Sequence, residues 1–187
     1  MDYEERLLVH HQFSLQKRRE LSPALGKRIS LQKNLLRELV ERLELLGDRF
    51  SAVHVRHTDL QSNYHDLIES LKSSSLNNIF VATDNRQVLQ DFYEALGHNR
   101  IKSFSTLPAN AGRTLHHTKH QDISQATANS DAILDLFTLT FAEHFSFGTI
   151  NNKPTSEHSG FSILAKTLQE NPLLRNEFLV QPPYQVI

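Results

Sequence analysis

The stretch Phe50–Leu60 reads FSAVHVRHTDL, and it decides the fold. It begins with the apolar residues Phe50, Ala52, Val53 and Val55 and ends in ionisable groups. A short apolar run of this kind is typical of a buried strand. Ligand sites in parallel sheets lie at the carboxyl ends of the strands. The stretch therefore predicts a strand whose far end carries a functional cluster of two histidines, an arginine and an aspartate.

The segment before this strand predicts a helix. Leucines recur every three or four positions from Leu31 to Leu46, which is the spacing of one helical face. Ser30 is expected to cap the start of this helix, and Gly47 to end it. A weaker helix is expected over the first 20 residues, with a break at Pro23.

After the strand, helical and apolar segments alternate. Helices are expected at 64–72, 85–96, 130–142 and 160–169, strands at 77–84, 100–106 and 144–148, and irregular structure at 107–129, 149–159 and 173–187. Strands that alternate with helices favour a parallel sheet covered by helices. The expected fold class is α/β, as a doubly wound, Rossmann-like, three-layer α/β/α arrangement.

The composition is that of an ordinary globular protein. The chain has 187 residues, 39% hydrophobic and 22% charged residues, a net charge of −1 and a mean hydropathy of −0.43. It has no cysteine, which excludes disulfides and thiolate chemistry. No run of residues has the length and apolarity of a membrane span or a secretory signal, so a cytoplasmic location is expected.

Polar groups gather where the expected strands end. His54, Arg56, His57 and Asp59 stand at the end of the first strand, and Asp84 stands at the end of the second. Alternate side chains of a strand share a face, so His54 and Arg56 should point the same way. An arginine at this place suits a phosphate, although a structural or solvated arginine is the commoner case. His57 and Asp59 are expected to shape the turn.

The expected last helix begins with Ser159, Gly160 and Ser162. Backbone N–H groups and hydroxyls at a helix start can bind a phosphate, although a Ser-Gly pair there is more often a simple cap. Together with Arg56, this helix start describes a diphosphate site.

Asp135 interrupts the apolar segment AILDLFTL. A carboxylate on a buried helical face is costly without a partner. Asp135 either lies on an exposed stripe or accepts two N–H bonds from a base such as guanine, and the pattern leaves both open.

The sequence gives little support for a metal ion or for a dinucleotide or nucleoside triphosphate as the ligand. His116 and His120 lie four residues apart, as in a metal pair on a helix, but no third ligand is nearby. The G-x-G-x-x-G and Walker lysine motifs of dinucleotide and triphosphate sites do not occur. No metal or other cofactor is therefore expected.

Three motifs in order resemble a known family. The segment AVHVRHTD looks like the HVRRTD motif of the α1,6-fucosyltransferases, which include nodulation enzymes and enzymes that fucosylate the N-glycan core. IFVATDN is similar to their second motif, and AILDLFTLTFAEHF followed by SGFSILAKTL to their third. The resemblance covers roughly residues 50–168. It implies the C-terminal, donor-binding half of a GT-B glycosyltransferase, a GDP-fucose donor, and inverting transfer of fucose without a metal.

The resemblance also implies roles for the candidate residues. Arg56 would hold the β-phosphate and stabilise the leaving GDP, which makes it the catalytic candidate. His54 and Asp135 would contact the guanosine portion. The remaining candidates are Asp84, near the nucleotide, and Ser159, Gly160 and Ser162, which would bind the pyrophosphate.

The chain departs from the family pattern in several places. His57 stands where the core-fucosylating enzymes have a second arginine, Asn85 stands where a second aspartate is frequent, and the polar insertion TINNKPTSEH precedes Ser159. The family's base is a carboxylate shortly after the first motif, and the sequence does not choose between Asp66 and Glu69.

The N-terminal half of the family has no counterpart. Residues 1–49 are expected to form a helical lead-in packed on the nucleotide-sugar-binding domain at 50–187. The chain is then a fragment, or assembles with a second chain, or no longer transfers sugar. A glycan acceptor is expected in the first two cases, and neither a nucleic-acid partner nor a membrane span in any case. The alternative function is a non-catalytic nucleotide-binding or interaction module.

Overall fold

The computed structural model of the chain describes residues 31–73, 77–107, 123–151 and 158–179. In chain order, the elements are α3 (Lys33–Leu46), β1 (Ser51–Val55), β2 (Ser62–Asn63), α4 (His65–Lys72), β3 (Ile79–Thr83), α5 (Arg86–Leu96), β4 (Ile101–Lys102), α6 (Gln125–Thr140), β5 (His144–Phe147), β6 (Thr149–Ile150), α7 (Gly160–Glu170) and α8 (Pro172–Leu179). None of the helices in these ranges is long and apolar enough to cross a membrane.

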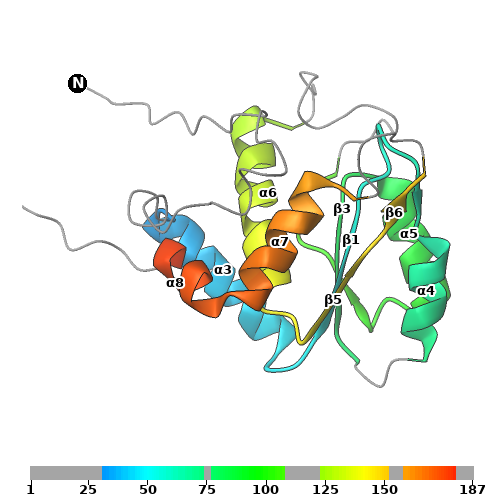
Figure 1. The fold of residues 1–187 in the computed structure, drawn as a ribbon, viewed down its shortest axis with the longest axis horizontal. Coiled ribbons are helices and arrows are strands. Elements are labelled where there is room, and N and C mark those ends of the chain that lie inside the picture. The colour runs from blue at the N-terminus through cyan, green and yellow to red at the C-terminus, as the bar shows by residue number, and fades with distance from the viewer. Residues whose placement is uncertain (1–30, 74–76, 108–122, 152–157, 180–187) are drawn as a thin grey trace, which may run out of the picture.

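Four strands form one parallel sheet in the order β4-β3-β1-β5. Strands β1 and β3 lie at its centre, and every residue of both is buried, as expected of strands covered on two faces. Helices α4 and α5 lie on one side of this sheet, and α3, α6 and α7 lie on the other (Figure 1). The expected α/β class with a helix-flanked parallel sheet is confirmed, and the arrangement is Rossmann-like.

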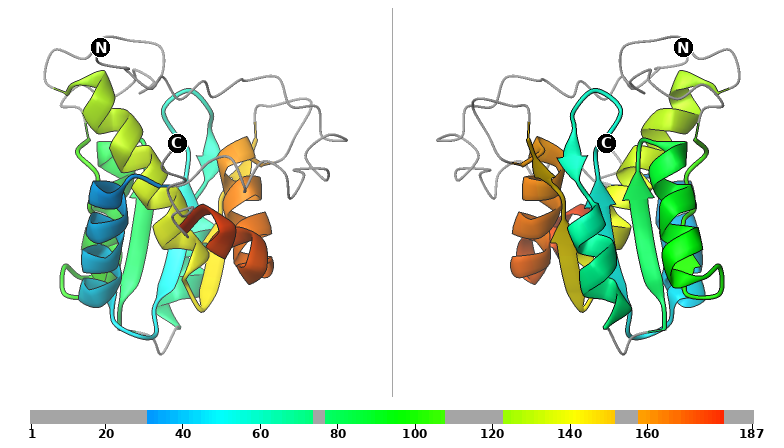
Figure 2. Two further views of the ribbon diagram at one scale, coloured as in Figure 1. Left: turned by 90° about the vertical axis from the view of Figure 1, so that its left-hand side faces the viewer. Right: turned by 90° about the vertical axis from the view of Figure 1, so that its right-hand side faces the viewer.

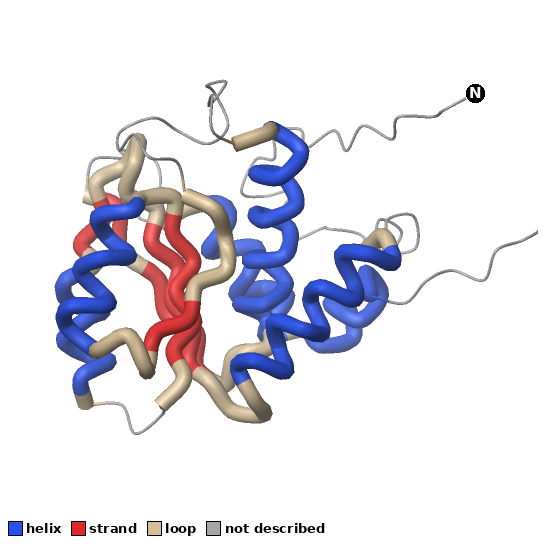
Figure 3. The backbone as a smooth tube through the Cα atoms, turned by 180° about the vertical axis from the view of Figure 1, so that it is seen from behind, coloured by secondary structure: helices blue, strands red, loops and turns tan. Residues whose placement is uncertain are grey.

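The two helical layers close two separate cores. Val53, Val81 and Phe92 belong to the core under α4 and α5. Phe80, Leu139 and Ala165 belong to the core on the opposite side, where Leu39 of α3 also packs against Leu134 of α6. The two side views of Figure 2 show these layers in turn, and Figure 3 shows the strands running together between the helices.

The order of connections reverses direction within the sheet. The chain passes from β1 to β3 to β4 over the face of α4 and α5, and then returns through α6 to β5 on the other side of β1. The strand order therefore reverses between β1 and β5. Ligands of open α/β sheets bind outside the carboxyl ends of the strands at such a reversal.

Several expected boundaries were wrong. Residues 173–187 were expected to be irregular, yet α8 covers Pro172–Leu179, where Phe178 packs on Phe137. Helix α6 starts at Gln125, inside the expected loop, because the Ser124 hydroxyl accepts a hydrogen bond from the Thr127 N–H and caps it. The segment at 100–106 forms only a two-residue strand, Ile101–Lys102.

A small second sheet was not expected. Strands β2 and β6 pair antiparallel, so Thr149–Ile150 belongs to a strand rather than to the expected polar loop. At its start, Gly148 lies so close to Ser62 that a Cβ on the glycine would be 3.1 Å from the serine Cβ. The expected cap Ser30 and the expected helix over the first 20 residues lie outside the described residues.

Candidate functional site

A small cavity opens at the carboxyl ends of β1 and β3, between these strands and helices α6 and α7. It is lined by His54, Arg56, Ala82, Thr83, Asp84, Ser105, Thr106, Ala128, Asp131, Ala132, Asp135 and Phe161. Four of the seven residues predicted to contact the ligand, His54, Arg56, Asp84 and Asp135, therefore meet at one place. The cavity has a volume of about 80 Å³, well below the ~300 Å³ at the lower end for sites that enclose a whole ligand. It can receive one end of a nucleotide, with the rest over the strand ends.

Arg56 follows β1 directly and lies at the mouth of this cavity. Its Nε and Nη2 donate to the two carboxylate oxygens of Asp59 at 2.8 and 2.7 Å. This side-on pair leaves Nη1 with no hydrogen-bond partner among the described residues. The hydrogen bond to Asp59 raises the pKa of Arg56 further above its ordinary value. Arg56 is thus a positive charge held in one orientation, and its Nη1 can donate hydrogen bonds to a ligand.

Asp84 follows β3 and closes the turn after β1. Its Oδ1 accepts the His57 N–H at 2.9 Å, and its backbone oxygen accepts the Thr58 hydroxyl at 2.8 Å. Burial raises the pKa of Asp84, and nearby Arg56 works against that rise. His57 accepts the Ser62 N–H at 3.2 Å through Nδ1. Asp84 and His57 therefore hold the turn that carries Arg56.

His54 points from β1 toward the start of α7. Its Nδ1 lies 2.7 Å from the Ser162 hydroxyl, and its ring packs against Phe161 with 4.7 Å between centroids. Burial, assisted by the charge of Arg56, lowers the pKa of His54 to about 3. The imidazole is therefore neutral at physiological pH. It presents a neutral hydrogen-bonding group to the cavity, and Arg56 supplies the positive charge.

Ser159 and Ser162 are turned inward at the start of α7. The Ser159 hydroxyl caps the helix by accepting the Ser162 N–H at 3.1 Å, and the two hydroxyls are 3.1 Å apart. Both residues are buried and neither lines the cavity, nor does Gly160. Their hydroxyls act as a cap and as a support for His54. The N–H groups of Gly160 and Phe161, which have no partner within the helix, are what this end of α7 offers an anion.

Asp135 is buried on α6, so the interpretation that placed it on an exposed stripe is wrong. Its Oδ1 accepts a hydrogen bond from Nη1 of Arg42 on α3 at 2.9 Å. Burial nevertheless raises the pKa of Asp135 to about 7, against the opposing effects of the Ser105 hydroxyl and of Arg42. The cavity wall therefore carries a carboxylate that titrates near neutral pH.

Sequence reasoning missed four residues at this site: Arg42, Asp131, Phe161 and Ser105. The sequence did contain a signal for Arg42. It lies three residues after Leu39 and four before Leu46, and this spacing places it on the apolar face of its helix. Asp131 and Asp135 are spaced four apart on a mostly apolar helix, which also places them on one face. Phe161 and Ser105 gave no pattern that distinguishes them from core and loop residues.

The residues suggested as the general base lie elsewhere. Asp66 and Glu69 are exposed on α4 and do not line the cavity. Glu69 forms an ion pair with Lys72 at 2.7 Å, and Asp66 accepts a hydrogen bond from Asn63. Both are helix-surface charges. The pair His116 and His120 lies outside the described residues, and within the described ranges no three acidic or histidine side chains are grouped to hold a metal ion.

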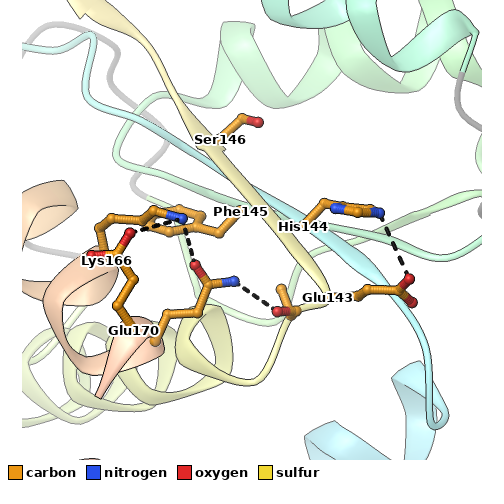
Figure 4. A pocket seen from close by; sticks show the side chains of 8 residues that line it. Glu143, His144, Phe145, Ser146, Lys166 and Glu170 are labelled. Atoms are coloured by element: carbon orange, nitrogen blue, oxygen red, sulfur yellow. Dashed lines mark hydrogen bonds and ion pairs between the residues drawn. The ribbon is translucent and has the colours of Figure 1, made fainter. Parts of the chain in front are cut away.

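A larger hollow lies along the outer edge of β5, beside α7 (Figure 4). It has a volume of about 480 Å³ and contains none of the predicted site residues. Several of its polar groups bind one another: Lys166 contacts Gln169 and Glu170, and Gln169 donates to the Ala142 carbonyl oxygen. It is a shallow surface feature without convergent free polar groups, so the smaller cavity at the strand ends is the candidate site.

No protein-family model matches the chain, and no curated protein matches it either. The likeness to fucosyltransferases therefore rests on the three sequence motifs alone.

Proposed function

We propose that this chain is the donor-binding domain of a fucosyltransferase-like glycosyltransferase, which binds GDP-fucose at the cavity and supports inverting, metal-independent transfer of fucose. The observation that carries the proposal is the convergence of Arg56 and Asp135 on one cavity from two different elements. Asp135 suits a base and Arg56 suits a phosphate. A nucleoside diphosphate is the ligand class that presents both.

The Asp135 end of the cavity is complementary to guanine. An ionised carboxylate has only acceptor sites, about four of them, and Arg42 occupies one. Guanine presents two adjacent donors, N1–H and N2–H₂, whereas adenine, cytosine and uracil each present an acceptor next to a donor. The aromatic ring of Phe161 and the methyl groups of Ala128 and Ala132 supply apolar walls for a planar ring.

The Arg56 end suits the diphosphate. In the proposed reaction an acceptor hydroxyl attacks the anomeric carbon of fucose, and the bond from that carbon to the β-phosphate oxygen breaks. The electron pair leaves with GDP, and the hydroxyl proton passes to a base. Arg56, held in place by Asp59, would stabilise the negative charge that develops on the β-phosphate. The N–H groups of Gly160 and Phe161, which have no partner within α7, would contribute to the same charge.

Calorimetry with GDP tests the binding step. The wild-type chain is expected to bind one GDP, and Arg56→Ala is expected to weaken binding about tenfold to a hundredfold, the cost of a lost charged hydrogen bond. Lys72→Gln, on the surface of α4, is the control and should bind as the wild type does. Absence of GDP binding by the folded wild type would overturn the proposal.

A second function is favoured by one observation. Neither Asp66 nor Glu69, the carboxylates suggested as base, lies at the cavity, so the chain could hold the nucleotide sugar without transferring it. Incubation with GDP-fucose, alone and with a glycan acceptor, separates the two functions. Release of GDP together with fucosylated acceptor supports the transferase. Binding without hydrolysis or transfer supports a non-catalytic nucleotide-binding module.

A further inference from the structure

Arg42 is a buried charge with several acidic partners. It lies on the apolar stripe of α3, and 4% of its surface is exposed. Its Nη2 donates to Glu38 at 3.0 Å and to Asp131 at 3.2 Å, and its Nη1 donates to Asp135 at 2.9 Å. Its guanidinium also packs over the Phe104 ring, 5.3 Å from the centroid. Such a group is costly to bury unless every charge is paired, so its placement calls for a role.

Arg42 holds two aspartates that face the cavity. Asp131 and Asp135 are one turn apart on α6, where like charges repel each other. Both aspartates line the cavity, whereas Arg42 does not. The Arg42 guanidinium therefore binds them from the side that faces away from the cavity. The other oxygen of Asp131 accepts the Thr106 N–H at 2.9 Å, which ties the segment after β4 to the same cluster. Helix α3 thereby fixes one wall of the candidate site.

We propose that Arg42 is a positioning residue that orients Asp135 and favours its ionised form, so that the cavity selects guanine over adenine. An ionised Asp135 offers acceptors alone and matches the two donors of guanine. A protonated Asp135 offers one donor and one acceptor, which matches N1 and N6–H₂ of adenine instead. The selectivity step rests on the proposed function. The effect of Arg42 on Asp135 does not.

The surrounding charges set the direction of this effect. Glu38 and Asp131 join Asp135 as negative groups in the Arg42 cluster, and Asp84 is a further carboxylate in the cavity wall. Arg42 is in direct contact with Asp135, Arg56 lies at the cavity mouth, and His54 is neutral. Burial already raises the pKa of Asp135 to about 7. Removal of the contacting positive charge should raise it further.

Carboxyl-carbon NMR titration of Asp135 tests this effect without any nucleotide. The resonance is assigned by its loss in Asp135→Asn. The wild-type midpoint is expected near pH 7, and Arg42→Met should shift it upward by about one pH unit or more. Arg42→Lys keeps one positive charge and should shift it less. Arg49→Gln, which removes an exposed ion pair with Glu143, is the control and should leave the midpoint unchanged.

Two results would overturn the positioning role: an Asp135 midpoint in Arg42→Met equal to or below that of the wild type, or equal midpoints in Arg42→Lys and Arg42→Met. If Arg42→Met does not fold, as judged by circular dichroism, Arg42→Lys alone decides. Its midpoint must then lie above that of the wild type.

Affinities for GDP and ADP between pH 6 and 9 test the selectivity step. The wild type should bind GDP about tenfold or more tightly than ADP at pH 8, where Asp135 is mostly ionised. In Arg42→Met the ratio of GDP affinity to ADP affinity should be smaller by a similar factor at pH 8. The variant should regain the wild-type ratio at higher pH, where its Asp135 ionises as well. Equal weakening of GDP and ADP at every pH would reduce Arg42 to a structural residue. A wild type that binds neither nucleotide would overturn the proposed function and the selectivity step, while the titration of Asp135 would still decide the positioning role.

Discussion

The two faces of the sheet bury different chemistry. The core under α4 and α5 is built from aliphatic and aromatic side chains such as Val81, Val88 and Phe92. The opposite side, under α3, α6 and α7, buries a set of polar and charged groups: Arg42, His54, Asp135, Ser159 and Ser162. Nothing in the packing of helices on a sheet requires such groups, and each costs free energy unless it is paired. The difference shows which face is built for packing alone and which face also serves the strand-end cavity.

The largest expected effect comes from the apolar face. Phe92→Ala removes a fully buried ring and should lower the free energy of unfolding by about 3–5 kcal/mol. Urea unfolding measures it. Because Phe92 lies away from the cavity, the folded fraction of the variant should bind GDP with the affinity of the wild type. A selective loss of GDP binding would break the division between the two faces.

A charge substitution on the polar face should cost almost as much. Arg42→Met leaves two carboxylates near the cavity without their partner, and loss of roughly 3 kcal/mol of unfolding free energy is expected at neutral pH. Arg49→Gln removes an exposed, two-bond pair with Glu143 and should leave the unfolding midpoint unchanged. If the two substitutions lowered the free energy of unfolding equally, the buried Arg42 cluster would contribute no more to stability than an exposed ion pair does.

The polar face should also show opposing pH dependences. The folded pKa of Asp135 lies near 7, above the ordinary 3.8, so its contribution to stability is full below pH 3.8 and is lost as the pH rises through 7. The folded pKa of His54 lies near 3, below the ordinary 6.5, so its contribution is full above pH 6.5 and is lost as the pH falls toward 3.

Unfolding free energies between pH 4 and pH 8 measure these slopes. Relative to Asp135→Asn, the wild type should lose up to about 1.4 kcal/mol per pH unit as the pH rises. Relative to His54→Asn, the wild type should gain unfolding free energy as the pH rises over the lower half of this range. A substitution on the apolar face, such as Val88→Ala, should give a pH-independent difference. Flat profiles for both polar variants would contradict the burial of these two groups.

The smallest expected effect compares one helix cap from each face. Ser159 caps α7 and Asn85 caps α5, and replacement of either by alanine should cost about 1 kcal/mol in thermal or urea unfolding. Only Ser159→Ala should also weaken GDP binding, because it disturbs the support of His54 and the N–H groups of Gly160 and Phe161 at the start of α7. If Asn85→Ala weakened GDP binding more than Ser159→Ala did, the face under α4 and α5 would be the one that serves the binding site.

Local patterns in the sequence predicted the large elements. The apolar runs of β1 and β3 and the leucine stripe of α3 are signals that a few neighbouring residues carry. The two-residue strands β2 and β6 have no period, and α8 has no sharp apolar stripe, so both escaped prediction. Their positions depend on contacts with distant segments rather than on their own residues.

The candidate site was predicted in part for the same reason. His54 lies near the end of β1, Arg56 follows β1 and Asp84 follows β3, and strand ends meet in a parallel sheet. The environment of Asp135 stayed open because its partner, Arg42, lies 93 positions earlier in the chain. A pairwise charge contact at that separation leaves no trace in a local pattern. The inward turn of the Ser159 and Ser162 hydroxyls likewise depends on His54, 108 positions before Ser162.

The most direct test of the central claim is an amide NMR titration of the wild-type chain with GDP. Binding at the strand-end cavity predicts shift changes that gather at the ends of β1 and β3, on the cavity side of α6 and at the start of α7. The amides of α4 and the second half of α5 should stay unchanged. Shift changes centred on α4 and α5, or none at saturating GDP, would contradict the account.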